Sequence, residues 1–338
     1  MKFVAKKSVV RSGLTAALSL ALLSSIPLAA RADALAQGVL EITAFRLTAS
    51  GGITSGIATG SGVVSGLFNG NALPGVNVSS VNFTQQSSLG VGYTPNTEYT
   101  GAVPGNFAGG STSINGVAIT NAPFNGLGAA AIADAVVSLQ PQGSGNVTSN
   151  TGTTFAYQFD LASASTVSIA FDADQFLRAL LVGNPILSGS ASASTAWSMT
   201  IAKTCVGFTP PPGQVCNGAG SSVFAWTPDG IVAPANPSLG IPAGAISGGI
   251  ETLDPFSLNR GVTASANFIN EDVISPVTGS FAARTNQLGA GRYTMTILQT
   301  ARSNATIEVP EPGTLALVGL SLVGLAAVGR RRSVRQAA

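Results

Sequence analysis

Strict alternation of apolar and polar residues in the second half of the chain constrains the fold more than any other feature. In the stretch FAYQFDL, the apolar residues Phe155, Tyr157, Phe159 and Leu161 fall on one side of an extended chain. A repeat of two residues is typical of a β-strand with one buried face. Similar alternation recurs at residues 167–171, 191–203, 223–227 and 292–300. Together with Gly and Pro turns at short spacing, this pattern predicts an all-β fold of the β-sandwich or jelly-roll type.

The first half is less regular. Residues 40–49 are predicted to form a strand, and residues 51–66 an edge strand or a loop. The alanine-rich run 128–139, GAAAIADAVVSL, is the best candidate for a helix, because alanine is a strong helix former. Residues 172–181, DADQFLRALL, are expected to form a short helix or a bent strand.

Composition excludes several classes of function. Only 9% of the residues are charged, and the chain contains no histidine. Mechanisms that need an imidazole, such as a Ser-His-Asp triad or a His-ligated zinc, are therefore excluded. The scarcity of lysine and arginine argues against nucleic-acid binding, which needs a basic surface. No cofactor is expected.

The N-terminus has the pattern of a secretory signal peptide. Basic residues precede an uncharged apolar stretch over residues 12–30, and the motif Ala30-Arg31-Ala32 follows. A basic region, a short apolar core and a small-x-small site are the three parts that a signal peptidase recognises. We expect residues 1–32 to form a signal helix that is cut after Ala32, with cuts after Ala34 or Ala36 as alternatives.

The C-terminus has the pattern of a membrane stop signal. Residues 313–329 carry no charge and are followed at once by Arg330, Arg331 and Arg332. A 17-residue helix spans about 25 Å, which is marginal for a bilayer core of about 30 Å. Clustered arginines stay on the cytoplasmic side, so the main body is expected outside the membrane.

The same segment carries a specific resemblance. Pro310-Glu311-Pro312, a short apolar helix and an arginine cluster, in that order, resemble the PEP-CTERM sorting signal of exported bacterial proteins. The resemblance covers residues 309–338. It implies that exosortase, a membrane enzyme, removes the tail. It further implies display on the surface, or release, in an organism that makes extracellular polysaccharide.

Between these segments, residues 33–308 are expected to form an extracellular all-β domain, either undivided or as two subdomains. Stretches 155–181, 191–201, 223–230 and 288–297 resemble a subgroup of exosortase-dependent surface proteins with large all-β domains. Residues 33–309 hold 13 acidic and 7 basic residues, a net charge of −6. The exported body is therefore mildly acidic, which favours solubility.

Cys205 and Cys216 are the only cysteines. In an oxidising compartment an even pair favours a disulfide, and the Pro-rich segment between them can turn the chain back. A loop of this length would contribute about 2–3 kcal/mol. A metal pair would need further ligands that the chain lacks.

Carboxylates offer the remaining chemistry. Asp172 and Asp174, with Asp160 in the preceding strand, are candidates for calcium, although a solvated turn is the expected reading and no metal is assigned. Glu251 and Asp254 are expected to be surface charges. A glycoside hydrolase needs two carboxylates at a set separation, and nothing marks such a pair.

Exposed aromatic side chains can stack on sugar rings. Trp197 and Tyr157 lie on core-type faces, whereas Trp226 precedes the turn Thr-Pro-Asp-Gly and is the better exposed candidate. The leading hypothesis is a non-enzymatic surface or biofilm-matrix protein, associated with extracellular polysaccharide. A secreted carbohydrate-binding module and a carboxylate-dependent glycoside hydrolase are the alternatives.

Overall fold

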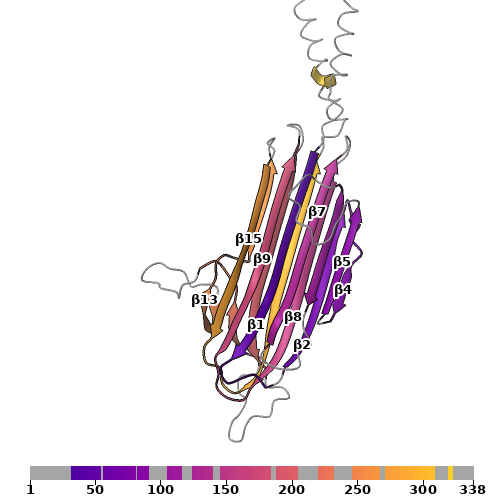
Figure 1. Ribbon diagram of the computed structural model, residues 1–338. Helices are drawn as coiled ribbons and strands as arrows, with labels where there is room; N and C mark the ends of the chain where they lie inside the picture. Colours follow the sequence, from indigo (N-terminus) through magenta and orange to yellow (C-terminus); the bar gives the residue numbers. More distant parts are fainter. Residues whose placement is uncertain are drawn as a thin grey trace, which may run out of the picture.

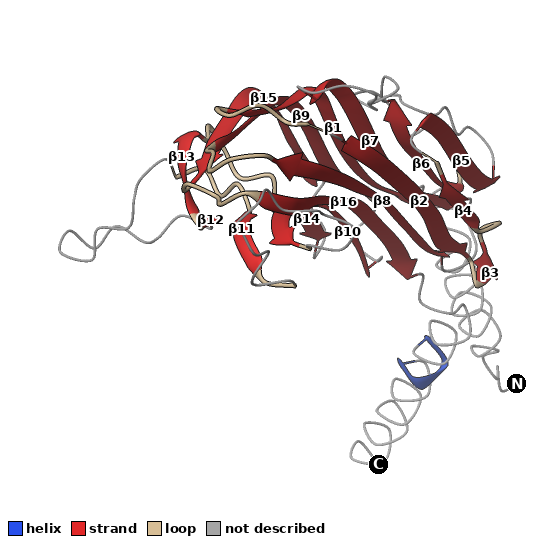
Figure 2. Ribbon diagram, turned by 90° about the horizontal axis from the view of Figure 1, so that it is seen from below, coloured by secondary structure: helices blue, strands red, loops and turns tan. Residues whose placement is uncertain are grey.

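The protein is a sandwich of two antiparallel β-sheets (Figures 1 and 2). The computed structural model describes residues 32–54, 56–80, 82–90, 105–115, 124–139, 145–183, 188–204, 220–231, 246–266, 271–308 and 319–322. The prediction of an all-β, sandwich-like fold is confirmed.

Sheet A contains seven strands. In spatial order they are β13 (Gly249–Leu253), β15 (Glu271–Thr285), β9 (Val167–Val182), β1 (Ala32–Ala49), β7 (Phe124–Leu139), β6 (Phe107–Asn115) and β5 (Asn82–Gly90). Strands β1, β7 and β9 are 16–18 residues long, and β1 pairs with the other two on both sides, with a register shift in each ladder at residues 42–46.

Sheet B contains nine strands. Seven follow one path, in the order β12 (Ile246–Ser247), β11 (Ser222–Trp226), β10 (Ser188–Lys203), β16 (Gly291–Glu308), β8 (Gly145–Leu161), β2 (Gly56–Phe68) and β3 (Asn71–Ala72). The other two are β14 (Arg260–Ala266), which pairs with β10, and β4 (Val76–Ser79), which pairs with β2. Residues 51–66, expected as an edge strand or a loop, thus supply most of β2, which pairs with β8 along its whole length.

Alternation along β8, β10 and β16 places odd-numbered residues in the core and even-numbered residues on the outside. Figure 2 shows the two sheets as stacked layers, and their inward-facing side chains fill the space between them. The alternating stretches in the sequence therefore form strands with one buried face, as predicted. Trp197 and Tyr157 are buried in this core, also as predicted.

The core differs between its two ends. At one end it is aromatic, with Phe45, Phe171, Trp197, Trp226 and Tyr293 fully or almost fully buried. At the other end it is built of small aliphatic side chains. These are mainly Ala34, Ala36, Ala108, Ala135, Ala179, Ala191, Ala193, Ala264 and Ala305. We call these parts the aromatic half and the alanine half.

Between the two halves the sheets approach each other closely at Gly38 of β1. A methyl group added there would lie 3.1 Å from the carbonyl oxygen of Ser194 and 3.2 Å from that of Arg302, both in sheet B. Glutamine side chains also cross the core. Gln299 donates to the carbonyl oxygen of Leu40 at 2.5 Å, and Gln175 donates to Thr195 Oγ1 at 2.7 Å. These hydrogen bonds give the buried amide nitrogens of both glutamines an acceptor on a neighbouring strand.

The predicted helix at residues 128–139 is wrong, because these residues belong to β7. Every residue from Ala131 to Ser138 is buried, so both faces of the strand are covered and no alternation of polarity is needed. Residues 172–181 belong likewise to β9, with continuous burial from Gln175 to Leu181. A short apolar run of this kind cannot be distinguished from a buried helix by periodicity.

Ala32 and Glu308 lie at the same end of the sandwich, next to the alanine half (Figure 1). Within the part of the chain that is described, no helix is both long and apolar enough to cross a membrane. The expected signal helix, residues 1–32, lies outside the described residues except for Ala32, which belongs to β1. So does the expected membrane helix, residues 313–329, apart from residues 319–322, which are helical.

Candidate functional site

Most residues of the predicted sorting signals lie outside the described residues. These are Ala30, Pro310, Glu311, Pro312, Arg330, Arg331 and Arg332. Both cysteines of the predicted disulfide, Cys205 and Cys216, also lie outside the described residues. Ala32 is the first residue of β1 and pairs with Leu139. Ala34 and Ala36 are buried in the core, so a cut after either would remove packed residues, whereas a cut after Ala32 would remove only the first residue of β1.

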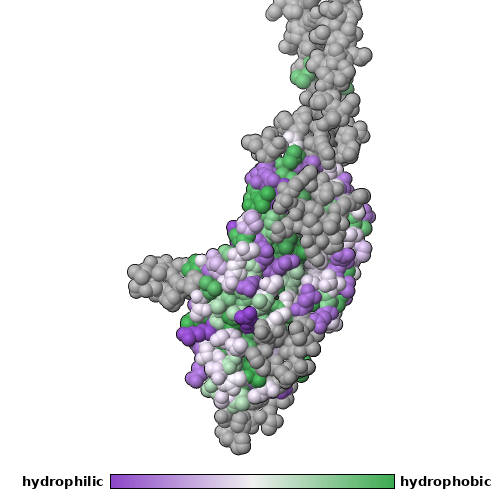
Figure 3. Space-filling model, viewed as in Figure 1, coloured by the Kyte–Doolittle hydropathy of each residue, from purple (hydrophilic) through white to green (hydrophobic). Residues whose placement is uncertain are grey.

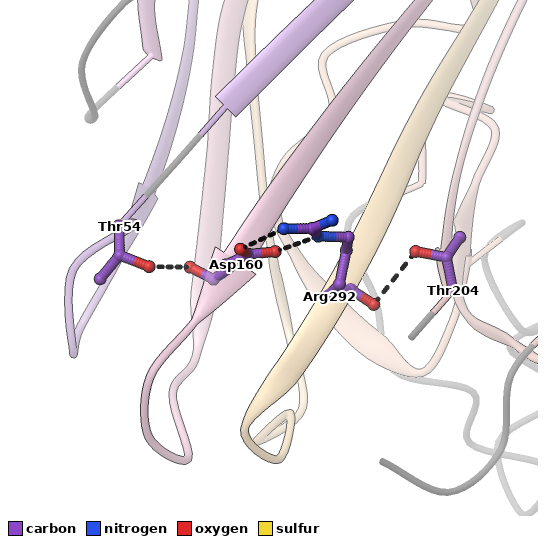
Figure 4. Close-up of polar contacts among 4 residues, drawn as sticks. All are labelled: Thr54, Asp160, Thr204 and Arg292. Atoms are coloured by element: carbon purple, nitrogen blue, oxygen red, sulfur yellow. Dashed lines mark hydrogen bonds and ion pairs between the residues drawn. The ribbon is translucent and has the colours of Figure 1, made fainter. Parts of the chain in front are cut away.

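The three aspartates considered as a calcium site do not converge. Asp172 and Asp174 project from the outer side of β9 in sheet A, where Ser280 donates to Asp172 at 2.6 Å. Asp160 lies in β8 of sheet B and forms a bidentate ion pair with Arg292, with N–O distances of 2.6 and 2.8 Å (Figure 4). Asp160 is thus paired with Arg292 on the side of the sandwich opposite to Asp172 and Asp174.

Figure 4 also shows how this ion pair is anchored. The hydroxyl of Thr54 donates to the carbonyl oxygen of Asp160, and that of Thr204 donates to the carbonyl oxygen of Arg292, each at 3.4 Å. The hydrogen bond to Asp160 raises the pKa of Arg292 above its ordinary value, so the guanidinium stays charged. The group ties β8 to β16 and has a structural role.

Trp226 is not exposed, which corrects the expectation from its place before a turn. Its side chain is fully buried in the aromatic half, with ring centroids 5.5 Å from Phe171 and 5.6 Å from Trp197. Strand β12 pairs with β11 and covers what would otherwise be an open edge. Stacking of a sugar ring on Trp226 is therefore excluded.

Glu251 and Asp254 are not simple surface charges either, because the structure brings them together with Asp229. One carboxylate oxygen from each lies within 4.8 Å of the others, and only 2% of Asp254 is exposed. We call these three residues the acidic corner. Asp229 follows β11 of sheet B, Glu251 lies in β13 of sheet A, and Asp254 directly follows β13.

Backbone and side-chain donors hold the acidic corner in place. The amides of Asp229 and Gly230 donate to Asp254 Oδ2 at 2.9 and 3.0 Å. The indole of Trp226 donates to Glu251 Oε1 at 2.6 Å. Gly230 has a positive φ of 86°, a backbone conformation that suits a glycine at this turn.

The acidic corner is electrostatically unfavourable for three charges. Burial raises the pKa of Glu251 to about 7, and the nearby carboxylates of Asp254 and Asp229 add to this effect. Burial likewise raises the pKa of Asp254, although hydrogen bonds from the backbone of residues 229–231 oppose the shift. Perturbed carboxylates are a common mark of a functional or ion-binding position. Glu251 and Asp254 are three residues apart, but Asp229 is distant in sequence, so only the fold reveals the cluster.

A second candidate is the outer face of sheet B, which we call the hydroxyl face. Its outward residues are mainly hydroxyl and amide side chains of four strands. They include Ser190, Ser192, Ser194, Ser198 and Thr200 of β10, Thr296, Thr300, Asn304 and Thr306 of β16, Asn146, Thr148, Asn150 and Thr154 of β8, and Thr59, Ser61 and Ser65 of β2. The register aligns them in rows across the strands, such as Ser194, Arg302, Asn150 and Ser65.

An open groove of about 650 Å³ runs across the hydroxyl face. Ser192, Thr148, Asn304 and Thr263 line it, together with Arg302, and none of its lining residues is acidic. Figure 3 shows the opposite side of the molecule, over sheet A, where hydrophilic and hydrophobic residues are interspersed. The groove offers many hydrogen-bonding groups and one positive charge, but no paired carboxylates.

Comparison with known proteins identifies the C-terminal segment. Residues 308–332 match the PEP-CTERM protein-sorting motif. No curated protein and no solved structure matches the chain significantly.

Proposed function

Because the chain carries the PEP-CTERM motif, which marks an exosortase-sorted, exported surface protein, we propose that its body is a non-enzymatic component of the cell surface or biofilm matrix. In this proposal the hydroxyl face contacts extracellular polysaccharide. Signal peptidase and exosortase are its processing enzymes.

The observation that carries the proposal is the groove on the hydroxyl face. Hydroxyl and amide groups in register along long strands match the repeating hydroxyl groups of a polysaccharide. Each contact contributes little, but many such contacts along one chain add up. Arg302 has no ion-pair partner among the described residues, so it suits an acidic sugar or a sulfate or phosphate substituent.

The alternatives have less support. A carbohydrate-binding module of the kind considered would stack sugars on an exposed Trp226, but Trp226 is buried. A glycoside hydrolase needs two carboxylates that flank a sugar in a cleft. The groove has no acidic lining residue, and the acidic corner is partly buried, with Asp254 only 2% exposed.

Processing can be tested by changing Pro310, Glu311 and Pro312 together to alanine in the full-length chain, expressed in cells that contain exosortase. The wild-type protein should lose its C-terminal tail, as measured by intact mass spectrometry of the envelope and medium fractions. The variant should stay in the membrane with its tail. Unchanged tail removal in the variant would refute exosortase processing at this motif.

Polysaccharide contact can be tested by co-sedimentation of the protein with polysaccharide from the same cells. Ser192→Leu with Asn304→Leu removes two hydrogen-bonding groups and obstructs the groove, so the bound fraction should fall several-fold. Thr278→Leu is the matched control, since Thr278 is exposed on β15 at the outside of sheet A. Equal binding by all three proteins would refute a role for the hydroxyl face.

A further inference from the structure

The acidic corner contains two buried carboxylate oxygens that have no hydrogen-bond partner. They are Oδ1 of Asp254 and Oε2 of Glu251. The second oxygen of each group is already engaged, in Asp254 by two backbone amides and in Glu251 by the indole of Trp226. Neither residue has an ion-pair partner among the described residues. Buried polar atoms without partners are rare, because each loses its hydration without compensation.

Carboxylate oxygens from three residues lie close together. One carboxylate oxygen of Asp229, Glu251 and Asp254 lies within 4.8 Å of each of the others. Three carboxylates held this close repel one another unless a positive charge lies between them. Asp254 is almost fully buried and is fixed by backbone amides, so it cannot turn away toward solvent.

We propose that Asp229, Glu251 and Asp254 bind a divalent cation of the calcium type. Calcium takes carboxylate and carbonyl oxygens at 2.3–2.6 Å and tolerates irregular geometry. All three side chains offer oxygen, and the chain has no histidine to favour zinc or another transition metal. The cation would pair with both unpartnered oxygens and balance most of the negative charge.

The location suggests what the cation does. Asp229 follows an edge strand of sheet B, whereas Glu251 and Asp254 belong to the edge of sheet A. Between β12 and β13 the chain crosses from one sheet to the other at Gly248. A cation bound by all three residues would cross-link the two sheets at this edge and cover the end of the aromatic half.

A shared proton is the competing explanation, because a protonated Glu251 would also reduce the repulsion. The two explanations differ in their response to cations. Terbium is a luminescent substitute for calcium, and its emission is excited through a nearby tryptophan. Trp226 donates to one of the proposed ligands, so it is placed to sensitise a bound terbium ion.

The experiment uses the full chain, purified in detergent and treated with a chelator, at pH 8. Terbium added to the wild-type protein should give strong emission on excitation of tryptophan, and calcium should displace it. Calcium at about 100 times its Kd should raise the Tm by several degrees, because it binds only the folded state. Glu251→Gln keeps an acceptor for the indole and should weaken calcium binding about tenfold or more. Asp254→Asn should have the same effect.

Asp172→Asn with Asp174→Asn is the matched control, since it removes two charges from an exposed acidic pair on sheet A. This variant should keep the terbium signal and the calcium-dependent Tm. The proposal is refuted if the wild-type protein shows neither response, or if Glu251→Gln responds like the wild type. Glu251→Gln decides the question even if Asp254→Asn does not fold.

Discussion

The two halves of the sandwich core bury their strands in different ways. In the aromatic half, large rings fill the space between the sheets, and the outer face of sheet A carries exposed polar residues such as Thr43, Asp172 and Asp174. In the alanine half the inner side chains are small, and the strands of sheet A are buried on both faces. This continuous burial covers residues 34–40, 107–114, 131–138 and 175–181.

The outer face over the alanine half includes buried polar groups as well as apolar ones. Arg178 forms a bidentate ion pair with Asp272 at 2.8 and 2.9 Å, and it lies beside Gln37, which donates to Asp134 at 2.6 Å. Leu35, Val136 and Leu180 form an apolar cluster on the same face. The aromatic half thus gains stability from large inward side chains, and the alanine half from burying both sides of its strands.

The largest expected effect is that of Phe171→Ala in the aromatic half. Phe171 stacks on Phe281 at 5.1 Å and contacts Trp197 at 4.8 Å, so its removal leaves a large cavity. We expect a loss of about 3–5 kcal/mol in the free energy of unfolding, measured by denaturant titration. Leu177→Ala in the alanine half should cost less. A greater loss for Leu177→Ala would contradict the view that the aromatic half dominates the inner core.

Gly38→Ala tests the close approach of the sheets. The added methyl would meet two backbone oxygens of sheet B at 3.1 and 3.2 Å, and backbone cannot move as a side chain can. We expect a destabilisation of about 1–3 kcal/mol by thermal or denaturant unfolding. Gly152→Ala is the control, because its nearest contacts would be 3.4 and 3.5 Å away. Equal effects of the two substitutions would mean that the sheets separate readily at Gly38.

Asp134→Asn tests the buried outer face of sheet A and should stabilise the protein. Burial raises the pKa of Asp134 from 3.8 to about 8, despite the hydrogen bond from Gln37. Burial disfavours the charged carboxylate of Asp134 in the folded state. The stability that protonated Asp134 contributes is therefore fully present below pH ~4 and is lost as the pH rises to about 8. At pH 8 the variant should be more stable by at least about 1 kcal/mol.

The measurement is the difference in Tm between Asp134→Asn and the wild type from pH 4 to pH 9. The variant keeps an oxygen that accepts from Gln37, and the other raised carboxyl groups, Glu41, Glu251 and Asp254, are the same in both proteins. The difference should grow with pH. A difference that is independent of pH would show that Asp134 is not protonated in the folded protein.

The smallest expected effect is that of Arg292→Met at the edge of the aromatic half. Its ion pair with Asp160 is partly exposed, with 21% and 13% of the two side chains accessible. A pair in this environment contributes about 1 kcal/mol or less and is weakened by salt. Unfolding in low and high salt should therefore show a small loss that shrinks at high salt. A loss of several kcal/mol would place this pair among the main stabilising groups.

The contrast between the halves explains how much of the fold could be predicted. Strands with one exposed face, such as β8 and β16, alternate in polarity, and their positions follow from the sequence. Strand β7 is buried on both faces over the alanine half, so its sequence is a continuous run of small apolar residues that also favours a helix. Its partners, β1 and β6, are what make it a strand.

The sorting motif and the acidic corner differ in the same way in how far the sequence alone predicts them. The sorting motif is a pattern of consecutive residues, so residues 310–312 could be recognised from the sequence without knowledge of the fold. The acidic corner needs the return of the chain from β11 through β12 to β13, which brings Asp229 beside Asp254. Trp226 was expected to be exposed because a turn follows it, but that same return covers it.

The shared position of Ala32 and Glu308 would set the orientation of the body if the predicted helix at residues 313–329 anchors the chain in a membrane. Strands of 16–18 residues extend about 50–60 Å, so the alanine half would then lie nearest the bilayer, and the aromatic half, with the acidic corner at its edge, would lie farther away. In that arrangement the sandwich would act as a spacer between the bilayer and its far end. The hydroxyl face runs along its flank, and a polymer lying parallel to the strands would extend outward from the cell.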